Sequence, residues 1–428
     1  MTLPDEAAIV AREEQAWAAL RALVRAEGDP LLGIVAPKLA IAGTGVDTVS
    51  RSAGFGALVT TAARARWRPG PMITVVDGIA IITASSGQAR ALAPVLTALA
   101  DEHEAVPARL PPVRPSALRS AHVTRRRLTP VLDDWSRTAG TAPIDISSEV
   151  FAAALVRARL AEWLDRTEPR RLVVATQHNT TVRAAVREAR DRGIPSTYVP
   201  HAPAADTPWY RDIPTDAALL RGQGEVDFYT GLGASSQHLA VVGDPSITHP
   251  LDRATVHAAA PLVWATSPQP ETTLRAIVAL LDETGLMIEV APHPRADRGL
   301  LERICPATWC WNRYPSTGTR LAVEPLAAVV QHRSGMGLEA AMRGVPVLEL
   351  CAPGRSMPYL YLRELACEVR TATDVVAALG ALPMADAIEA TSLRWCAATG
   401  DEAAIATATR LRSDDDVATG PVLDGWLT

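Results

Sequence analysis

Lysine is almost absent from this chain of 428 residues: Lys38 is the single lysine, so arginine carries nearly all of the positive charge. Together with frequent alanine, this bias is typical of high-GC codon usage, and an individual arginine is therefore weak evidence for an anion site. The formal net charge of −5 argues against a nucleic-acid partner, because such partners are attracted by clustered positive charge. We expect no nucleic acid among the ligands.

Cysteine is scarce as well, with five residues, all in the last third of the chain and none in a CxxC pair. This pattern indicates buried thiols in a reducing cytosol rather than a disulfide framework or a zinc site. The acidic N-terminus lacks the cationic and apolar regions of a signal peptide. No apolar run approaches the roughly 18 residues of a membrane span. These absences predict a cytoplasmic protein without a transmembrane segment.

Several catalytic motifs are also missing, namely HExxH, GxSxG and the lysine of a P-loop. Without an acidic cluster that binds Mg²⁺, a leaving group would have to be stabilised by helix N-termini and polar side chains. We therefore predict that the protein binds no metal and no cofactor.

From residue 171 onward, short apolar runs alternate with amphipathic segments, a rhythm that predicts parallel sheets. The rhythm stops at Gly243-Asp244-Pro245 and resumes after residues 246–260, which indicates two sheets. We expect an N-terminal domain of residues 1–250, a C-terminal domain of residues 251–400, and a tail of residues 401–428 that could pack back on the first domain. Because ligands bind at the carboxyl ends of parallel strands, two facing sheets would form an interdomain cleft.

The first 170 residues have a less regular pattern. Helical spacing and β-branched runs predict helices over residues 4–27, 89–100 and 144–165 and strands over residues 31–36, 72–76 and 79–83. Asp77-Gly78 separates the last two strands, which indicates a hairpin or two neighbouring strands. The Pro- and Arg-rich residues 107–130 are interpreted as a long connection, and its arginine stretch Arg114–Arg127 as a solvated loop, with a site for an anionic acceptor or a lipid headgroup as the alternative.

Residues 329–350 are the most informative segment, because they predict a buried strand, a loop of small residues, a short helix and a second buried strand. This loop, called the glycine loop below, consists of Ser334, Gly335, Met336 and Gly337. Its free backbone N–H groups, together with the helix dipole, would favour a phosphate. Glu339, in the first helical turn, could accept two hydrogen bonds from a diol such as a ribose. The alternative is a purely structural glycine turn.

A histidine follows another predicted strand, in the sequence Ala291-Pro292-His293-Pro294-Arg295. The prolines keep the backbone extended, so His293 would lie at the same sheet edge as the glycine loop. There it could donate a hydrogen bond to a diphosphate oxygen or protonate that oxygen as it leaves. Arg295 would add positive charge. Thr266 and Ser267 end the first strand of this sheet, where they could contact the donor phosphates or simply form a turn.

The N-terminal half has its own candidates at strand ends. His201 follows the predicted strand of residues 196–200, and a neutral imidazole there is a candidate base for an acceptor hydroxyl. His178 is a second candidate base, and Asn179 a candidate acceptor contact; a solvated loop before a helix is the alternative for both. Ser85, Ser86 and Gly87 form a third candidate loop, which would contact an acceptor or cover the donor; helix capping explains the two serines equally well.

With these residues in place, the C-terminal half resembles the donor domain of GT-B glycosyltransferases. Pro292-His293-Pro294 and Ser334-Gly335 are similar to the histidine-proline and serine motifs of bacterial polysialyltransferase-like enzymes and CDP-glycerol glycerophosphotransferases. The resemblance implies that His293, Ser334 and Gly335 contact the donor phosphates and that Glu339 contacts the nucleotide ribose. His201 lies in a segment that resembles the element carrying the proposed base of the glycerophosphotransferases.

This resemblance extends over residues 170–380, with two departures. Ala291 stands where a lysine often precedes the proline, so anion binding would fall to Arg295 or Arg333. Pro200 and Ala202 flank His201 in place of glutamine and glycine.

We therefore expect an α/β chain of the GT-B type, with two Rossmann-like, doubly wound domains facing across a cleft. The expected function is metal-independent, inverting transfer of a sugar from a nucleotide-activated donor to an acceptor hydroxyl, with His201 or His178 as the base. The sequence does not name the acceptor, which could be a polysaccharide, a lipid-linked sugar or a small natural product. The alternatives are a nucleotide-sugar epimerase or hydrolase of the same fold and a non-catalytic protein that binds nucleotide sugars.

Overall fold

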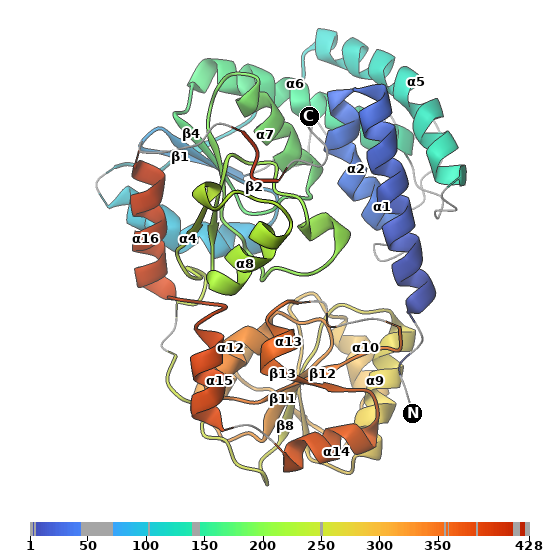
Figure 1. Ribbon diagram of the computed structural model, residues 1–428, viewed down its shortest axis with the longest axis vertical. Coiled ribbons are helices and arrows are strands. Elements are labelled where there is room, and N and C mark those ends of the chain that lie inside the picture. Colours follow the sequence, from blue (N-terminus) through green and yellow to red (C-terminus); the bar gives the residue numbers. More distant parts are fainter. Residues whose placement is uncertain are drawn as a thin grey trace.

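The computed structural model describes Leu3 and Met357 together with residues 6–43, 72–101, 103–138, 146–248, 251–354, 359–381, 384–413 and 420–423. Two α/β domains lie one above the other, each with a central sheet between layers of helices (Figure 1). The fold class expected from the sequence is confirmed: the protein is an α/β chain with two Rossmann-like, doubly wound domains.

The N-terminal domain contains a seven-stranded sheet of order β3-β1-β2-β4-β5-β6-β7. Its strands are β1 (Met72–Val76), β2 (Ile79–Thr83), β3 (Val106–Ala108), β4 (Arg171–Val174), β5 (Ser196–Tyr198), β6 (Ala217–Leu220) and β7 (Leu239–Val241). The strands from β2 to β7 are parallel, whereas β1 pairs antiparallel with β2 and β3. Asp77 and Gly78 both have positive φ (50° and 68°), as a two-residue hairpin turn requires, so the hairpin alternative is correct.

Helices cover both faces of this sheet, because alternate side chains of each strand point to opposite sides. One face packs against α4 (Ser86–Ala100) and α16 (Gly400–Arg412). The other side carries α1 (Ala7–Glu27), α2 (Pro30–Gly43), α5 (Pro115–Thr138), α6 (Ile146–Thr167) and α7 (Thr180–Arg190), of which α7 contacts β4 and β5, whereas α5 packs on α6 and α1 on α2. A shorter helix, α8 (Gln223–Gly231), follows β6, and single 3₁₀ turns occur at Pro208–Tyr210 and Ser236–His238.

The C-terminal domain contains a six-stranded, fully parallel sheet of order β10-β9-β8-β11-β12-β13. Its strands are β8 (Leu262–Ala265), β9 (Ile288–Ala291), β10 (Cys310–Trp311), β11 (Ala328–Gln331), β12 (Val347–Leu350) and β13 (Ala366–Val369). The helices α9 (Glu271–Glu283), α10 (Arg298–Ile304) and α14 (Ala372–Gly380) cover one face. The opposite face carries α11 (Thr317–Val323), α12 (Met336–Met342), α13 (Leu362–Leu365) and α15 (Ala385–Ser392).

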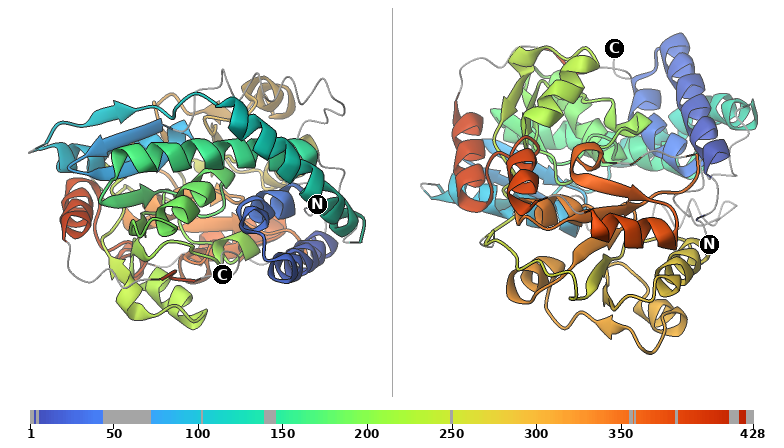
Figure 2. Two further views of the ribbon diagram at one scale, coloured as in Figure 1. Left: turned by 90° about the horizontal axis from the view of Figure 1, so that it is seen from above. Right: turned by 60° about the horizontal axis from the view of Figure 1, so that its bottom comes forward.

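The chain crosses between the domains at residues 243–247 and returns at residues 396–400. Asp244 and Thr399 form a bridge where the two crossings meet. Beyond the second crossing, α16 lies against α4 of the first domain (Figures 1 and 2). At the other end of the chain, Leu3 is buried in the core of the C-terminal domain, whereas α1 packs on α2. One apolar cluster contains residues of both domains, so the interface between them is partly apolar.

Two secondary-structure predictions for the N-terminal half are wrong. Residues 31–36 belong to helix α2 and not to a strand. Asp29 caps this helix by accepting a hydrogen bond from the N–H of Leu31 (2.8 Å). Every residue from 31 to 37 is buried, so no polar face reveals a helical period, and a short apolar run of this kind cannot be distinguished from a buried strand.

The second error concerns residues 107–130, most of which form the first part of α5 instead of a connection. Leu128, Leu132 and Trp135 make a buried stripe at helical spacing that packs on α6, and residues such as Arg126 lie on the exposed side. Pro115 stands at the first helical position, where its missing N–H costs no hydrogen bond. The density of proline and arginine hid this amphipathic period.

Within the described part of the chain, no single helix has both the length and the apolar composition needed to cross a membrane. The bent pair α14 and α15, 103° apart, passes the same length and composition test only when the two helices are taken together.

Candidate active site

The loops that follow the parallel strands of the two sheets meet between the domains. The N–H of Leu360 in the C-terminal domain donates to the carbonyl oxygen of Ala204 in the N-terminal domain (3.1 Å). A Cβ atom on Gly335 would stand 3.7 Å from Cδ of Pro203. The loop that carries His201 is therefore a neighbour of the glycine loop (residues 334–337), although the two are more than 130 residues apart in sequence.

His201 leaves β5 at this edge, with Nδ1 lying 2.5 Å from the carbonyl oxygen of Ala175. A carbonyl oxygen only accepts, so Nδ1 carries the proton and Nε2 of the neutral ring has a free lone pair. Burial lowers the pKa of His201, and Arg221 and Arg295 lower it further, against the Ala175 carbonyl and Asp244, which raise it. The ring is therefore neutral at pH 7 with an accepting Nε2, the form that a general base requires.

His178 lies on the loop after β4, beside His201. Its Nδ1 is 3.3 Å from Oγ1 of Thr176, a hydroxyl that can donate or accept, so this contact does not fix the tautomer. Burial, the His201 ring and Arg183 lower the pKa of His178 to about 4. A group with so low a pKa takes up protons poorly at neutral pH, which favours His201 over His178 as a base.

His293 follows β9 in the C-terminal domain and has the opposite tautomer. Its backbone N–H donates to Oγ1 of Thr266 (2.8 Å), and its Nδ1 accepts from the backbone N–H of Arg295 (3.0 Å). Nδ1 is therefore unprotonated, and Nε2 of the neutral ring carries the hydrogen. Burial lowers the pKa of His293, as do the charges of Arg295 and Arg90. This imidazole is thus a donor at Nε2, whereas that of His201 is an acceptor.

The hydroxyl groups of Thr266 and Ser267 bind neighbouring strand ends. Thr266 accepts from the backbone of His293, and the Ser267 hydroxyl donates to the carbonyl of His332 after β11 (2.5 Å). Both side chains are buried. They join the ends of β9, β8 and β11, so His293 and the glycine loop lie along one sheet edge. Their predicted contact with donor phosphates stays a prediction.

Hydrogen bonds with buried polar groups fix the backbone of the glycine loop. Oγ of Ser334 accepts from the N–H of Met336 (3.4 Å), and the Ser334 carbonyl accepts from the hydroxyl of Tyr361 (3.2 Å). Gly337 is buried, and a Cβ there would lie 3.0 Å from the Tyr361 hydroxyl. Gly335 is exposed, and the Met336 side chain packs against the core. The backbone at Gly335 is therefore the part of the loop that a ligand can reach.

Three more predicted contacts have partners within the protein. Glu339 forms an ion pair with the buried Arg343 (3.5 Å). Asn179 caps α7 through its side-chain oxygen, and Ser85 caps α4 in the same way. The first turn of α4 contains Ser86 and Gly87. Helix capping therefore accounts for Asn179 and Ser85, and their contact with an acceptor stays a prediction.

The two arginines that could replace the missing lysine have different surroundings. Arg333, directly before the glycine loop, forms an ion pair with Glu6 of the N-terminal segment. Arg295 is exposed, and no side chain in the described ranges pairs with its guanidinium group. Because this group lowers the pKa of both His201 and His293, it lies within electrostatic reach of both rings. Arg295 is thus the arginine whose charge is available to an anionic ligand.

Sequence reasoning missed Glu349, which lies on β12 beneath the glycine loop. Its carboxylate accepts from the side chain of Gln331 (2.9 Å) and from the backbone N–H of Arg333 (2.8 Å). Arg333 has a left-handed backbone (φ 56°), which is costly for a residue other than glycine, and Glu349 helps to hold it. Burial raises the pKa of Glu349 to about 8, against these two hydrogen bonds. The sequence did contain one signal for this group, because Glu349 is the single acidic residue in the otherwise apolar strand β12.

We expect the stability of the protein to fall with rising pH because of Glu349. The unfolded chain releases this proton near pH 4.5 and the folded protein near pH 8, so stability is lost across that window by up to about 1.4 kcal/mol per pH unit. In Glu349→Gln the group no longer titrates. The difference in melting temperature between this variant and the wild type should therefore shift in favour of the variant between pH 5 and pH 9. A difference that is constant with pH would contradict the raised pKa.

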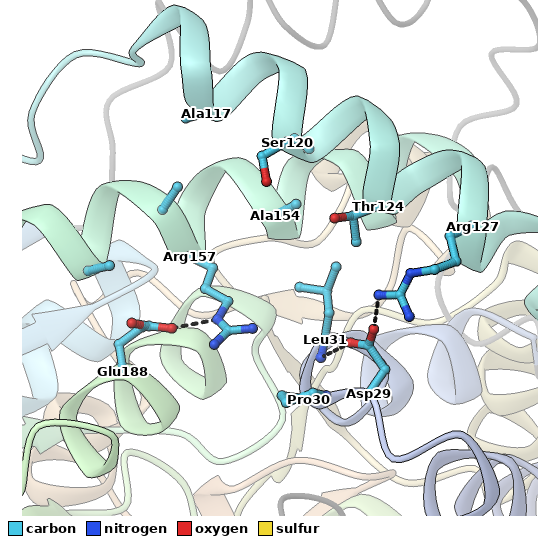
Figure 3. A pocket seen from close by; sticks show the side chains of 13 residues that line it. Asp29, Pro30, Leu31, Ala117, Ser120, Thr124, Arg127, Ala154, Arg157 and Glu188 are labelled. Carbon is cyan, nitrogen blue, oxygen red and sulfur yellow. Dashed lines mark hydrogen bonds and ion pairs between the residues drawn. The ribbon is translucent and has the colours of Figure 1, made fainter.

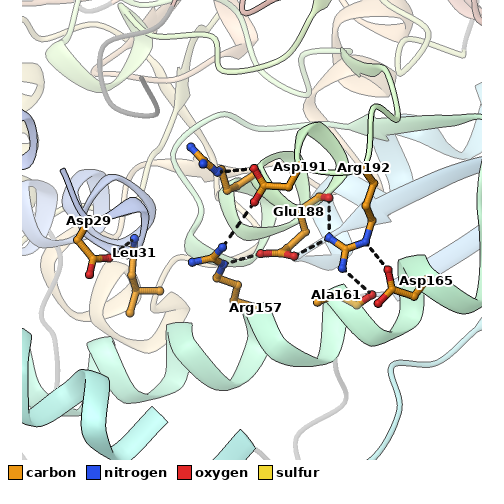
Figure 4. A network of polar contacts seen from close by, with 9 residues as sticks. Asp29, Leu31, Arg157, Ala161, Asp165, Glu188, Asp191 and Arg192 are labelled. Carbon is orange, nitrogen blue, oxygen red and sulfur yellow. Dashed lines mark hydrogen bonds and ion pairs between the residues drawn. The ribbon is translucent and has the colours of Figure 1, made fainter. Parts of the chain in front are cut away.

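A cavity of about 360 Å³ lies elsewhere, in the helical layer of the N-terminal domain between α2, α5, α6 and α7 (Figure 3). Its charged wall residues pair with each other or with close neighbours. Asp29 pairs with Arg127 (Figure 3), and Glu188 is shared by Arg157 (2.5 Å) and Arg192 (2.7 Å) (Figure 4). None of the predicted site residues lines this cavity. We therefore assign the candidate active site to the domain interface.

Among the residues that the structure describes, no three His, Cys, Asp or Glu side chains are grouped as metal ligands would be. The expectation that the protein uses no metal stays a prediction.

No protein-family model and no curated protein sequence matches the chain. The solved structures similar to it include a complex of MnaA from S. aureus with UDP, at 15% identity and a TM-score of 0.46, covering 74% of this chain and 91% of that one. A UDP-N-acetylglucosamine 2-epimerase from Rickettsia bellii has 13% identity and a TM-score of 0.45, with coverages of 78% and 94%.

The apo form of the lipopolysaccharide outer core galactosyltransferase WaaB is also similar, at 15% identity and a TM-score of 0.39, covering 61% of this chain and 81% of that one. Similarities this distant assign no activity to the chain.

Proposed function

We propose that this protein binds a nucleotide-activated sugar between its two domains and transfers the sugar to an acceptor hydroxyl without a metal ion. The observation that carries the proposal is the pair of opposite tautomers. His201 has an accepting Nε2 on one sheet edge, and His293 has a donating Nε2–H on the edge that faces it. A transfer reaction needs one base for the nucleophile and one donor for the leaving group, and these two rings supply both.

In the proposed reaction, Nε2 of His201 takes the proton of the acceptor hydroxyl as its oxygen attacks the anomeric carbon. The bond from that carbon to the diphosphate breaks, and the electron pair leaves with the diphosphate. Nε2–H of His293 and the guanidinium of Arg295 stabilise the negative charge that develops there. Attack on the side opposite the leaving group inverts the configuration. Gly335 and Glu339 are the predicted contacts for the phosphates and the ribose.

A thermal-shift screen against UDP, GDP, CDP, CMP and dTDP tests the binding half of the proposal. A nucleotide at a hundred times its Kd should stabilise the folded protein by about 2.7 kcal/mol and raise its melting temperature. A protein that responds to none of the five nucleotides would contradict the proposal.

The sugar derivative of the nucleotide that binds then separates transfer from the alternative reactions. Consumption of this donor only when a hydroxyl acceptor is present supports a transferase. Conversion of the donor alone to an isomer or to free sugar would identify an epimerase or a hydrolase acting at the same site.

A further inference from the structure

The loop that carries His201 is fixed by a buried arginine from the next strand. Arg221 directly follows β6, and its side chain is 1% exposed. Its Nη2 donates to the carbonyl of Pro200 (3.0 Å) and its Nη1 to the carbonyl of Ala202 (2.5 Å), the residues on either side of His201. One guanidinium group therefore holds the backbone both before and after the proposed base.

Two carboxylates complete this network. Nε of Arg221 donates to Asp244 (2.6 Å). Glu225, on α8, accepts from the backbone N–H of Arg221 (3.0 Å) and from that of Ala204 (2.9 Å). The loop after β5 is thus attached at three backbone positions to two buried side chains, Arg221 and Glu225.

The same network contacts both crossings between the domains. Asp244 lies in the first crossing, and its N–H donates to the carbonyl of Ala398 in the second (2.8 Å). The carbonyl of Arg221 accepts from Ala397 (3.0 Å). The two crossings lie too close together to leave room for a side chain between them, because a Cβ on Gly243 would stand 2.2 Å from the carbonyl oxygen of Ala398. A movement of either crossing would therefore displace Asp244 or the backbone of Arg221, because both are hydrogen-bonded to these segments.

We propose that Arg221 and Asp244 are positioning residues for His201, which they anchor to the two interdomain crossings. The role rests on the proposed function in one respect, that His201 is the base. Arginine suits it because its planar fork can bind a carboxylate and two carbonyls at once, which the single ammonium of lysine cannot do.

The charged groups around His201 define what a test should measure. Asp244 raises the pKa of His201, whereas Arg221 and Arg295 lower it. His178 is the neighbouring titratable ring, and its own pKa is lowered to about 4. Removal of the Asp244 charge should consequently lower the pKa of His201.

The experiment is an NMR titration of the histidine rings in the ligand-free chain of 428 residues, with the His201 signals identified by their loss in His201→Ala. In Asp244→Asn, the His201 titration should shift to lower pH. The matched control is Glu289→Gln, because Arg320 in the C-terminal domain is equally buried, pairs with Glu289 (2.8 Å) and also donates to two backbone carbonyls. Both variants should lower the melting temperature, but only Asp244→Asn should move the His201 titration.

A second variant keeps the test decisive if Asp244→Asn does not fold. Arg221→Lys retains the positive charge but cannot bind the carbonyls of both Pro200 and Ala202. The ¹⁵N chemical shifts of the His201 ring should then change from those of a single Nδ1–H tautomer to those of a mixture of tautomers. Arg320→Lys is its control and should leave these shifts unchanged. A His201 ring that titrates as in the wild type in Asp244→Asn, or keeps its tautomer in Arg221→Lys, would overturn the proposal. Neither measurement needs a nucleotide, so failure here is distinct from failure of the proposed function.

Discussion

Replacement of His201 by alanine is expected to reduce the turnover rate by about 10²–10⁴-fold, the usual contribution of a general base, and to leave nucleotide affinity close to that of the wild type. The reason is the free Nε2 lone pair, which is fixed by the contact of Nδ1 with the Ala175 carbonyl. Two quantities are measured. One is kcat with the sugar derivative of the nucleotide found in the screen and a hydroxyl acceptor that supports turnover, and the other is the nucleotide affinity by calorimetry.

His178→Ala is the matched control for that experiment, because this ring lies at the same sheet edge and its pKa is about 4. We expect a smaller loss of turnover in this variant than in His201→Ala. If His178→Ala lost turnover and His201→Ala kept it, the base would be His178 and the assignment of His201 would be wrong.

Replacement of His293 by alanine should weaken nucleotide diphosphate binding by about tenfold to a hundredfold. That range corresponds to the roughly 1.5–3 kcal/mol of a hydrogen bond to a charged group. The lost group is the Nε2–H donor, which exists because Nδ1 already accepts from Arg295. Calorimetric titration with the nucleotide that raises the melting temperature most is the direct measurement.

The chain offers a close control in His257. Its Nδ1 accepts from the backbone N–H of Ala259 (3.3 Å), the same local turn as at His293, but it precedes β8 and so lies at the amino end of the strand. His257→Ala should leave nucleotide affinity unchanged. Equal affinities of the wild type and His293→Ala would remove His293 from the phosphate site.

Pairs such as β4 with α7 and β8 with α9 were predictable because each consists of a buried apolar strand followed by an amphipathic helix, and burial on both faces leaves a strong sequence signal. In α2 and α5 the signal failed for opposite reasons. One helix is buried along most of its length and shows no polar face, whereas proline and arginine obscure the apolar stripe of the other.

Arg221 shows a different limit of sequence reasoning. The codon bias toward arginine made every arginine weak evidence, although Glu225 four residues later was a usable sign of a local ion pair. Its contacts with Pro200, Ala202 and Asp244 join three segments distant in sequence, so no local pattern could reveal them.

The sequence by itself determined that two largely parallel sheets form and that His201, His293 and the glycine loop follow strands, because buried apolar runs predict strands and the prolines beside both histidines prevent helix there. Only the tertiary structure decided the tautomers of the two histidines, the pairing of Arg333 with Glu6 and the raised pKa of Glu349. The tautomer of His293 is set by the nearby N–H of Arg295, but the other features depend on atoms from distant segments, such as the carbonyl of Ala175 for His201.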